Sequence, residues 1–172
     1  MNESPQRLGK GMIYAAWLLA LILLTLFFNH YLDKQQNPNQ KLTTQFHQDG
    51  VREVSLKRNR HGHYVANGTI NGQPVVFFLD TGATIVSIPE HIANALNLQK
   101  GRAIRSSTAN GVITTHSTKL DSVALGSIEL HGVRASINPY MSDNQILLGM
   151  SFLKDLDFAQ RGNTLILRQY PN

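Results

Sequence analysis

One carboxylate follows an apolar run near the middle of the chain, in the stretch FFLDTGATIV. Strands tolerate Asp and Gly poorly, so the triplet Asp80-Thr81-Gly82 predicts that a strand ends here in a turn. Gly82 lets the backbone approach closely, and the Thr81 hydroxyl can lock the turn by hydrogen bonds. A carboxylate held in this way could act as a general acid or base. The alternative is an ordinary turn with a solvated aspartate, because one tripeptide is only moderate evidence.

The segments around this triplet are mostly short, alternating and punctuated by Gly and Asn, a pattern typical of a sheet or barrel. Residues 63–70 and 75–79 are predicted strands joined by a turn that contains Asn-Gly. One short helix is predicted over 89–98, because it begins with a proline and has helical apolar spacing. Its buried stripe is expected to comprise Ile92, Ala95 and Leu96. The fold class expected is all-β with one or two short helices.

A second Asn-Gly pair, Asn110-Gly111, lies at the centre of the stretch AIRSSTANGVITTHSTKL. Both arms of this stretch are polar. Because Asn-Gly favours the tight turn of a β-hairpin, we expect a long, exposed and movable hairpin. Gly111 is expected at positive φ, where a β-branched residue is strongly disfavoured.

Other residue types give weaker signals for a chemical site. The chain has no cysteine, so it contains neither a disulfide framework nor a thiolate zinc site. His61 and His63 would share one face of a strand, but the spacing supplies no third ligand, so we favour surface or packing histidines. Ser87 and Ser151 have no histidine at a spacing useful for a serine nucleophile. No metal and no cofactor are expected.

The composition fits one domain and an extra segment, because a compact domain usually takes about 100–200 residues and the chain has 172. Lys and Arg number 16 against 11 Asp and Glu, a formal charge of +5. This balance is compatible with an acidic partner or a membrane surface. The basic residues are scattered, and no basic helix or Gly-aromatic RNA motif is present, so nucleic acid is not expected as a partner.

The extra segment lies at the N-terminus. Residues 12–28 contain no charge, and this run of 17 residues nearly crosses a hydrocarbon core of about 30 Å when helical. We expect a transmembrane anchor over 12–32 and not a cleaved signal peptide, because no small-x-small site follows the run. Arg7 and Lys10 precede it, so the positive-inside rule predicts that residues 1–11 are cytoplasmic and the rest lies across the membrane. In a bacterium that side is the periplasm.

A polar stretch rich in Gln and Asn, residues 33–48, follows the apolar run. Its composition cannot bury a core, so we predict a flexible linker with an r.m.s. reach of roughly 20–24 Å. Residues 49–172 are then expected to form the folded domain.

The order of the motifs is more specific than any single motif. An apolar strand, the Asp80–Ala83 motif, a short helix, an Asn-Gly hairpin and the Ile146–Gly149 segment follow one another. Over about Val51 to Arg168, this order resembles the retropepsin-like aspartic proteases, most closely their bacterial membrane-anchored members. The resemblance implies a closed, barrel-like all-β domain equivalent to half of a pepsin-type enzyme.

The resemblance also implies roles for individual residues. Asp80 is expected to be catalytic. The rest of the active-site turn is expected to be shaped by Thr81, Gly82 and Ala83. The flap, which covers a polypeptide substrate, is expected to be the loop of Ala109, Asn110 and Gly111. The segment 147–149 is expected to pack beneath the turn as a structural support.

Aspartic proteases use two carboxylates that share a proton, because like charges so close together cannot both ionise. This chain has one Asp-Thr-Gly triplet, and the sequence around Asp121 lacks the glycine. A homodimer would supply the second Asp80 on its twofold axis, and a twofold contact is the commonest assembly of identical chains. Met150 stands where retroviral relatives commonly carry an arginine that stabilises the dimer. The dimer interface, and the place of the predicted strand 164–168, therefore stay open.

Two functions follow as hypotheses. The first is a homodimeric aspartic endopeptidase anchored in the bacterial inner membrane, which faces the periplasm and cuts a membrane or envelope protein. The second is a retropepsin-fold dimerisation or peptide-binding module without catalysis. The fold alone cannot separate them, but the intact triplet favours the enzyme, because a binding module needs no such carboxylate. Ala83 stands where pepsin-type enzymes usually carry a hydroxyl residue, so a less acidic pH optimum than theirs is expected.

Overall fold

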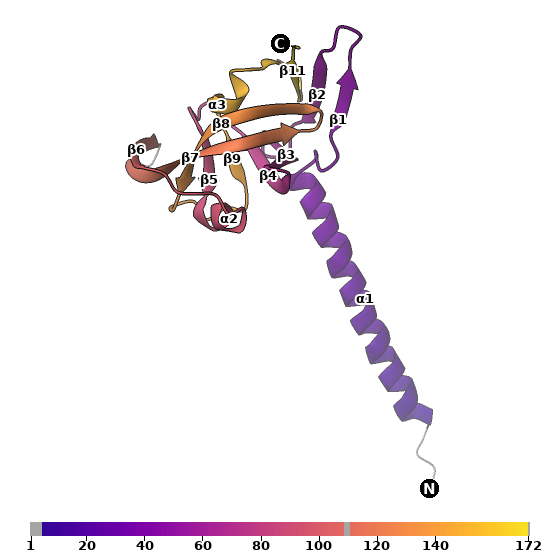
Figure 1. Cartoon of the computed structure of the whole chain (residues 1–172). Helices are drawn as coiled ribbons and strands as arrows, with labels where there is room; N and C mark the ends of the chain where they lie inside the picture. The colour runs from indigo at the N-terminus through magenta and orange to yellow at the C-terminus, as the bar shows by residue number, and fades with distance from the viewer. Residues whose placement is uncertain (1–4, 109–110, 172) are drawn as a thin grey trace. The chain divides into compact units, whose positions relative to one another are not determined.

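The computed structural model describes residues 5–108 and 111–171 of the chain (Figure 1). The helices are α1 (Pro5–Gln36), α2 (Glu90–Ala95) and α3 (Met150–Leu153). The strands are β1 (Thr43–Phe46), β2 (Arg52–Lys57), β3 (Tyr64–Ile70), β4 (Gln73–Leu79), β5 (Val86–Pro89), β6 (Ala103–Thr108), β7 (Gly111–Leu125), β8 (Ile128–Asn138), β9 (Ile146–Leu148), β10 (Asp157–Arg161) and β11 (Thr164–Gln169). The chain divides into two units, one up to Gln36 and one from Asn37 onward.

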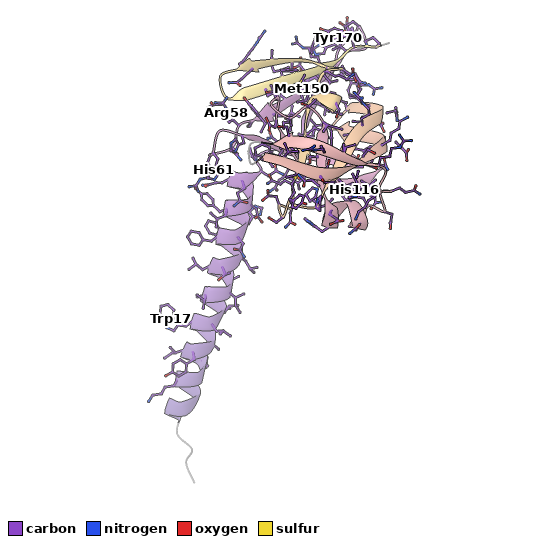
Figure 2. All side chains as sticks on the ribbon, turned by 90° about the vertical axis from the view of Figure 1, so that its left-hand side faces the viewer. Trp17, Arg58, His61, His116, Met150 and Tyr170 are labelled. Carbon is purple, nitrogen blue, oxygen red and sulfur yellow. The ribbon has the colours of Figure 1, made fainter. Side chains whose placement is uncertain are left out.

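The first unit is the helix α1, whose apolar side chains are exposed on all sides, as Trp17 illustrates in Figure 2. Its Lys10–Gln36 part is long and apolar enough to cross a membrane, by length and composition. A signal sequence near an N-terminus has the same properties. A helix that is apolar all round requires an apolar environment, such as lipid or a protein core.

The second unit contains a closed barrel. Its larger sheet has the strand order β3-β4-β9-β5-β8-β7-β6, and β3 also pairs with β7 through Ile70 and Val123. This pairing closes the sheet on itself and leaves β6 outside the ring. The long strands β7 and β8 lie side by side across the unit (Figure 1). The core is apolar, and Phe77 and Phe152 are its largest wholly buried side chains.

The β3–β4 hairpin turns at the first Asn-Gly pair, as the sequence predicts. Asn71 and Gly72 have φ values of 50° and 76°, the positive φ at both central positions that a type I′ turn requires. The Asn71 Oδ1 also accepts a hydrogen bond from the Ser122 N–H at 3.0 Å. This turn sets the register that places Leu79 at the end of β4 opposite Tyr64.

The smaller sheet has the order β1-β2-β11-β10, so the C-terminal strand β11 pairs within its own chain. Arg168 lies opposite Glu53 in register, and its Nε donates to the Glu53 Oε2 at 2.7 Å. The hydrogen bond and the charge of Glu53 raise the pKa of Arg168 above its ordinary value. The predicted strand 164–168, whose place the sequence analysis left open, is therefore part of β11 and lies between β2 and β10.

The residues predicted to be a flexible linker have defined structure instead. Asn37 and Asn39, directly after α1, are buried. The Asn39 Nδ2 donates to the carbonyls of Lys57 and Val65 at 2.8 Å and 2.7 Å, and its Oδ1 accepts from the Lys57 N–H at 2.6 Å. The Asn37 Nδ2 donates to the Asn67 Oδ1 at 2.7 Å. We call Asn37, Asn39 and Asn67 the asparagine clasp.

The clasp explains why a polar composition did not yield a flexible segment. An asparagine side chain has both a carbonyl acceptor and two N–H donors, so it can replace a backbone partner at a strand edge. After the clasp, β1 pairs with β2 from Thr43↔Ser55 to Phe46↔Arg52. Polar residues therefore join this segment to the barrel through hydrogen bonds, where the sequence analysis looked only for apolar burial.

Candidate active site

The Asp80 side chain is oriented by its own turn. Asp80 directly follows β4, and its N–H donates to the Leu148 carbonyl at 3.2 Å. Its Oδ1 accepts from the Gly82 N–H at 2.8 Å, and the Ala83 N–H donates to the Asp80 carbonyl at 3.2 Å. The aspartate side chain thus substitutes for a backbone partner, as in an Asx-turn. The residue is half-buried, so water can still reach its carboxylate.

The segment after β9 holds this turn in place. β9 lies between β4 and β5 in the sheet. Directly after it, the Met150 N–H donates to the Ala83 carbonyl at 2.8 Å. A Cβ at Gly149 would lie 2.6 Å from the carbonyl oxygens of both Ala83 and Ile85, closer than real Cβ contacts, so only glycine fits without movement. The structure therefore has the close contact between the 147–149 segment and the turn that the sequence predicts.

Ser151 is a positioning residue that the sequence analysis considered only as a nucleophile. Its Oγ accepts from the Val86 N–H at 2.9 Å and donates to the Arg134 carbonyl at 2.7 Å. The side chain is buried, and these two bonds connect β5 with β8. Because its hydrogen is already donated, the hydroxyl is not prepared for nucleophilic attack. One feature of the sequence could have indicated this buried role: Ser151 is the one polar residue in the otherwise apolar segment MSFL.

The β6–β7 hairpin contains the predicted flap. Its strands pair antiparallel up to Thr108↔Gly111, and Gly111 has a φ of 112°, positive as expected. The Ser106 and Thr115 hydroxyl oxygens are 2.7 Å apart and connect the two arms. The other predicted flap residues, Ala109 and Asn110, lie outside the described residues.

A cavity of about 720 Å³ lies between the Asp80 turn, the hairpin and β8. The turn contributes Gly82 and Ala83 to its lining, and the hairpin contributes Ile104 and Thr115. Thr81 is exposed and is not among the lining residues. Ligand cavities typically measure about 300–1,000 Å³. The space is therefore large enough for several side chains of a bound peptide.

One chain brings one carboxylate to this turn. Asp121 is exposed on β7 and lines a different cavity, together with Asn71 and Lys100. In residues 5–108 and 111–171, no group of three or more His, Asp or Glu is placed to hold a metal ion. The turn can therefore supply a carboxylate base or acid, but it holds only half of the carboxylate pair that an aspartic mechanism uses.

Comparison with known proteins identifies this arrangement. Residues 66–155, more than half of the chain, match the family model described as "gag-polyprotein putative aspartyl protease". The chain belongs to this family. The matched range of this family member includes the Asp80 turn, both described arms of the hairpin and the Gly149 support.

A solved structure agrees with this membership. The retropepsin-like aspartic protease from Rickettsia conorii matches with a TM-score of 0.57 and 27% identity, over 75% of this chain and 95% of that chain. The all-β, retropepsin-like fold predicted from the sequence is therefore confirmed.

Two curated proteins are also similar to this chain. An uncharacterized protein in the cobV 5′ region of Sinorhizobium sp. is 26% identical over an alignment of 179 positions. The alignment covers 96% of this chain and 77% of the relative. An uncharacterized protein of Rickettsia prowazekii is 28% identical over 136 residues, 77% of this chain. The match covers only 56% of that second relative's length.

Proposed function

We propose that this retropepsin-like chain is an aspartic endopeptidase with Asp80 as its catalytic residue. The observation that carries the proposal is the half-buried Asp80 carboxylate, oriented by the Gly82 N–H beside a cavity of about 720 Å³. In this proposal, Thr81, Gly82 and Ala83 shape the turn. The flap that covers the polypeptide substrate is formed by Ala109, Asn110 and Gly111.

Peptide hydrolysis by carboxylates needs a base and an acid. One carboxylate takes a proton from a water molecule as the water oxygen attacks the scissile carbonyl carbon, while its protonated partner donates to the carbonyl oxygen. The tetrahedral intermediate then loses the C–N bond as the leaving amine takes up a proton. Because one chain contributes one Asp80, we propose a homodimer in which the second carboxylate comes from the twofold-related copy.

The proposal also includes a location. α1 anchors the protease in a bacterial inner membrane, with the N-terminus cytoplasmic and the folded unit periplasmic. It is supported by the uncharged run over 12–28 and by Arg7 and Lys10 before it. The substrate is then a polypeptide of the membrane or envelope. The proposed mechanism uses no metal, cofactor or nucleic acid.

The test compares cleavage of a peptide library by wild-type protein and by Asp80→Asn, with the products read by mass spectrometry. The full chain in detergent is used, because a fragment that starts at residue 49 would lack β1, which pairs with β2. Asp121→Asn is the matched control, since that carboxylate is exposed and lines a different cavity.

Asp80→Asn should abolish cleavage, whereas Asp121→Asn should cut like the wild type. Equal cutting by wild type and Asp80→Asn, in samples freed of other proteases, would show that cleavage does not need Asp80 and would refute the proposal. Peptide binding without any cleavage by the wild type would instead support the alternative, a retropepsin-fold dimerisation or peptide-binding module.

A further inference from the structure

The strand β8 presents a row of polar side chains to the cavity beside the Asp80 turn. Arg134, Ser136 and Asn138 all line the cavity, and they alternate with buried apolar residues of the core. Alternate residues of a strand share one face and follow each other at about 6.6 Å, because each residue rises about 3.3 Å. The three side chains therefore form one row along the cavity wall. We call them the β8 row.

Two members of the β8 row are buried polar groups with unused hydrogen-bonding capacity. Ser136 is 2% exposed, and its hydroxyl makes no hydrogen bond with another residue of the described ranges. The Asn138 Oδ1 accepts from the Tyr140 N–H at 2.9 Å, which fixes the amide orientation because only the oxygen can accept. Its Nδ2 donors have no acceptor among the described residues. Neither polar atom is among the enclosed unpartnered atoms of the described residues, so both are open to the cavity and can bond a ligand there.

The cavity carries positive charge without an acid in its described lining. Arg105 of the β6–β7 hairpin lines the same cavity as Arg134, so two cationic residues border it. Like charges that share one cavity repel each other. No ion pair between described residues involves either of them, and no described Asp or Glu lines the cavity. An anionic group in the cavity would relieve this repulsion.

We propose that the β8 row is a specificity subsite for an acidic side chain, Glu or Asp, of the peptide substrate. The proposal rests on the endopeptidase activity proposed above and adds a substrate class to it. The substrate carboxylate accepts hydrogen bonds from the Arg134 guanidinium, which fits a carboxylate in a bidentate geometry, and from the Ser136 hydroxyl or the Asn138 amide. The hairpin residues Ile104 and Ile113 line the same cavity and contact the aliphatic part of the side chain.

The experiment begins with the sequence preference of the full-length wild-type protein. The peptide library should show enrichment of Glu and Asp at one fixed position relative to the cut. Three peptides that carry Glu, Gln or Leu at this position are then compared by kcat/KM. We expect the wild type to cut the Glu peptide at least ten times more efficiently than the Gln peptide, with most of the difference in KM. Salt should reduce this ratio, because it screens the charge pair.

Single-residue variants test whether the β8 row causes the preference for an acidic substrate side chain. Arg134→Gln should bring the Glu/Gln ratio close to one, because it removes the charge that discriminates between the two peptides. Arg134→Glu should favour a Lys peptide over the Glu peptide. Ser136→Ala should lower kcat/KM for the Glu and Gln peptides relative to the Leu peptide. Arg161→Gln, an exposed cation on β10, is the matched control and should preserve all ratios.

Failure of the subsite and failure of the protease function give different results. If the wild type cuts the library without enrichment of acidic residues, or if Arg134→Gln keeps the wild-type Glu/Gln ratio, the subsite is refuted and the protease function stands. If the wild type cuts no peptide, binding of fluorescent Glu and Gln peptides to Asp80→Asn still tests the row. A binding preference for Glu that disappears on adding Arg134→Gln supports the row, and equal binding of both peptides refutes it.

Discussion

Gly149→Ala measures how closely catalysis depends on the contact between the β9–α3 junction and the Asp80 turn. The new Cβ would lie 2.6 Å from two carbonyl oxygens, those of Ala83 and Ile85, whereas ordinary van der Waals contact begins at 3.4 Å. The turn or the junction must therefore shift by up to the 0.8 Å difference between these distances. Because the Ala83 N–H is bonded to the Asp80 carbonyl, this shift reaches the Asp80 carboxylate, the proposed catalytic group. A misplacement of about 1 Å can cost about 100-fold in rate, so we expect kcat/KM to fall about 10- to 100-fold.

The control for Gly149→Ala separates misplacement of the turn from general loss of stability. Overpacking at Gly149 should lower the free energy of unfolding by about 1–3 kcal/mol. Gly162→Ala, in the β10–β11 turn, places a Cβ in open space at a φ of 58°, which costs about 1–2 kcal/mol of backbone strain. Thermal melting should thus detect both variants, whereas peptide cleavage well below either melting temperature should detect only Gly149→Ala. Wild-type activity in Gly149→Ala would refute the role given to this glycine.

Mixtures of wild-type and Asp80→Asn chains, above the dimer dissociation constant, should show activity that follows the square of the wild-type fraction, about a quarter at an equal mixture. A linear response that leaves about half, with chain mixing confirmed by mass spectrometry, would overturn the shared pair of carboxylates. Gly111→Val should slow peptide turnover with little change in melting temperature, because its side chain meets open space but strains a positive φ; loss of folding would show that the hairpin belongs to the core. Asn39→Ala removes the side-chain partners of one buried and two part-buried backbone groups, so chemical denaturation should show a loss of about 2–4 kcal/mol; an unchanged midpoint would contradict the clasp. Lys100 holds the pKa of Glu90 below its usual 4.5, so the pair stabilises the fold above that pH. The melting-temperature difference between wild type and Glu90→Gln should disappear as the pH falls through the folded pKa, and a difference that persists in acid would exclude this ion pair as its cause.

The features that sequence alone predicted are those fixed by short segments. The turn at Asn71-Gly72 and the positive φ of Gly111 follow from backbone geometry that few residues adopt. The turn at Asp80 is also local, because its carboxylate bonds to the N–H two residues on. Such constraints need no knowledge of the rest of the fold.

The features that sequence missed depend on partners far along the chain. Ser151 bonds to an N–H 65 residues away, and Asn39 bonds to a carbonyl 26 residues away. The helix α2 shows the same limit in one of its three predicted positions. Leu96 is buried and Ile92 packs against the core as predicted, but Ala95 is exposed and Ala93 is buried in its place. A helix this short is oriented by the strands it packs against and not by its own apolar spacing.

With α1 in a membrane, as proposed, the asparagine clasp limits the length of chain between the bilayer and the second unit. Four residues separate Leu32, the end of the predicted span, from Asn37, the start of the second unit, and all four are helical. They add only about 6 Å of length, compared with roughly 20–24 Å for a flexible linker of the predicted length. With α1 in a membrane as proposed, a scissile bond must pass within about one domain diameter of the lipid surface. The clasp would then restrict cleavage to peptide bonds close to the membrane surface. A sequence just outside the bilayer would be cut, whereas the same sequence on a distant part of a large ectodomain would not.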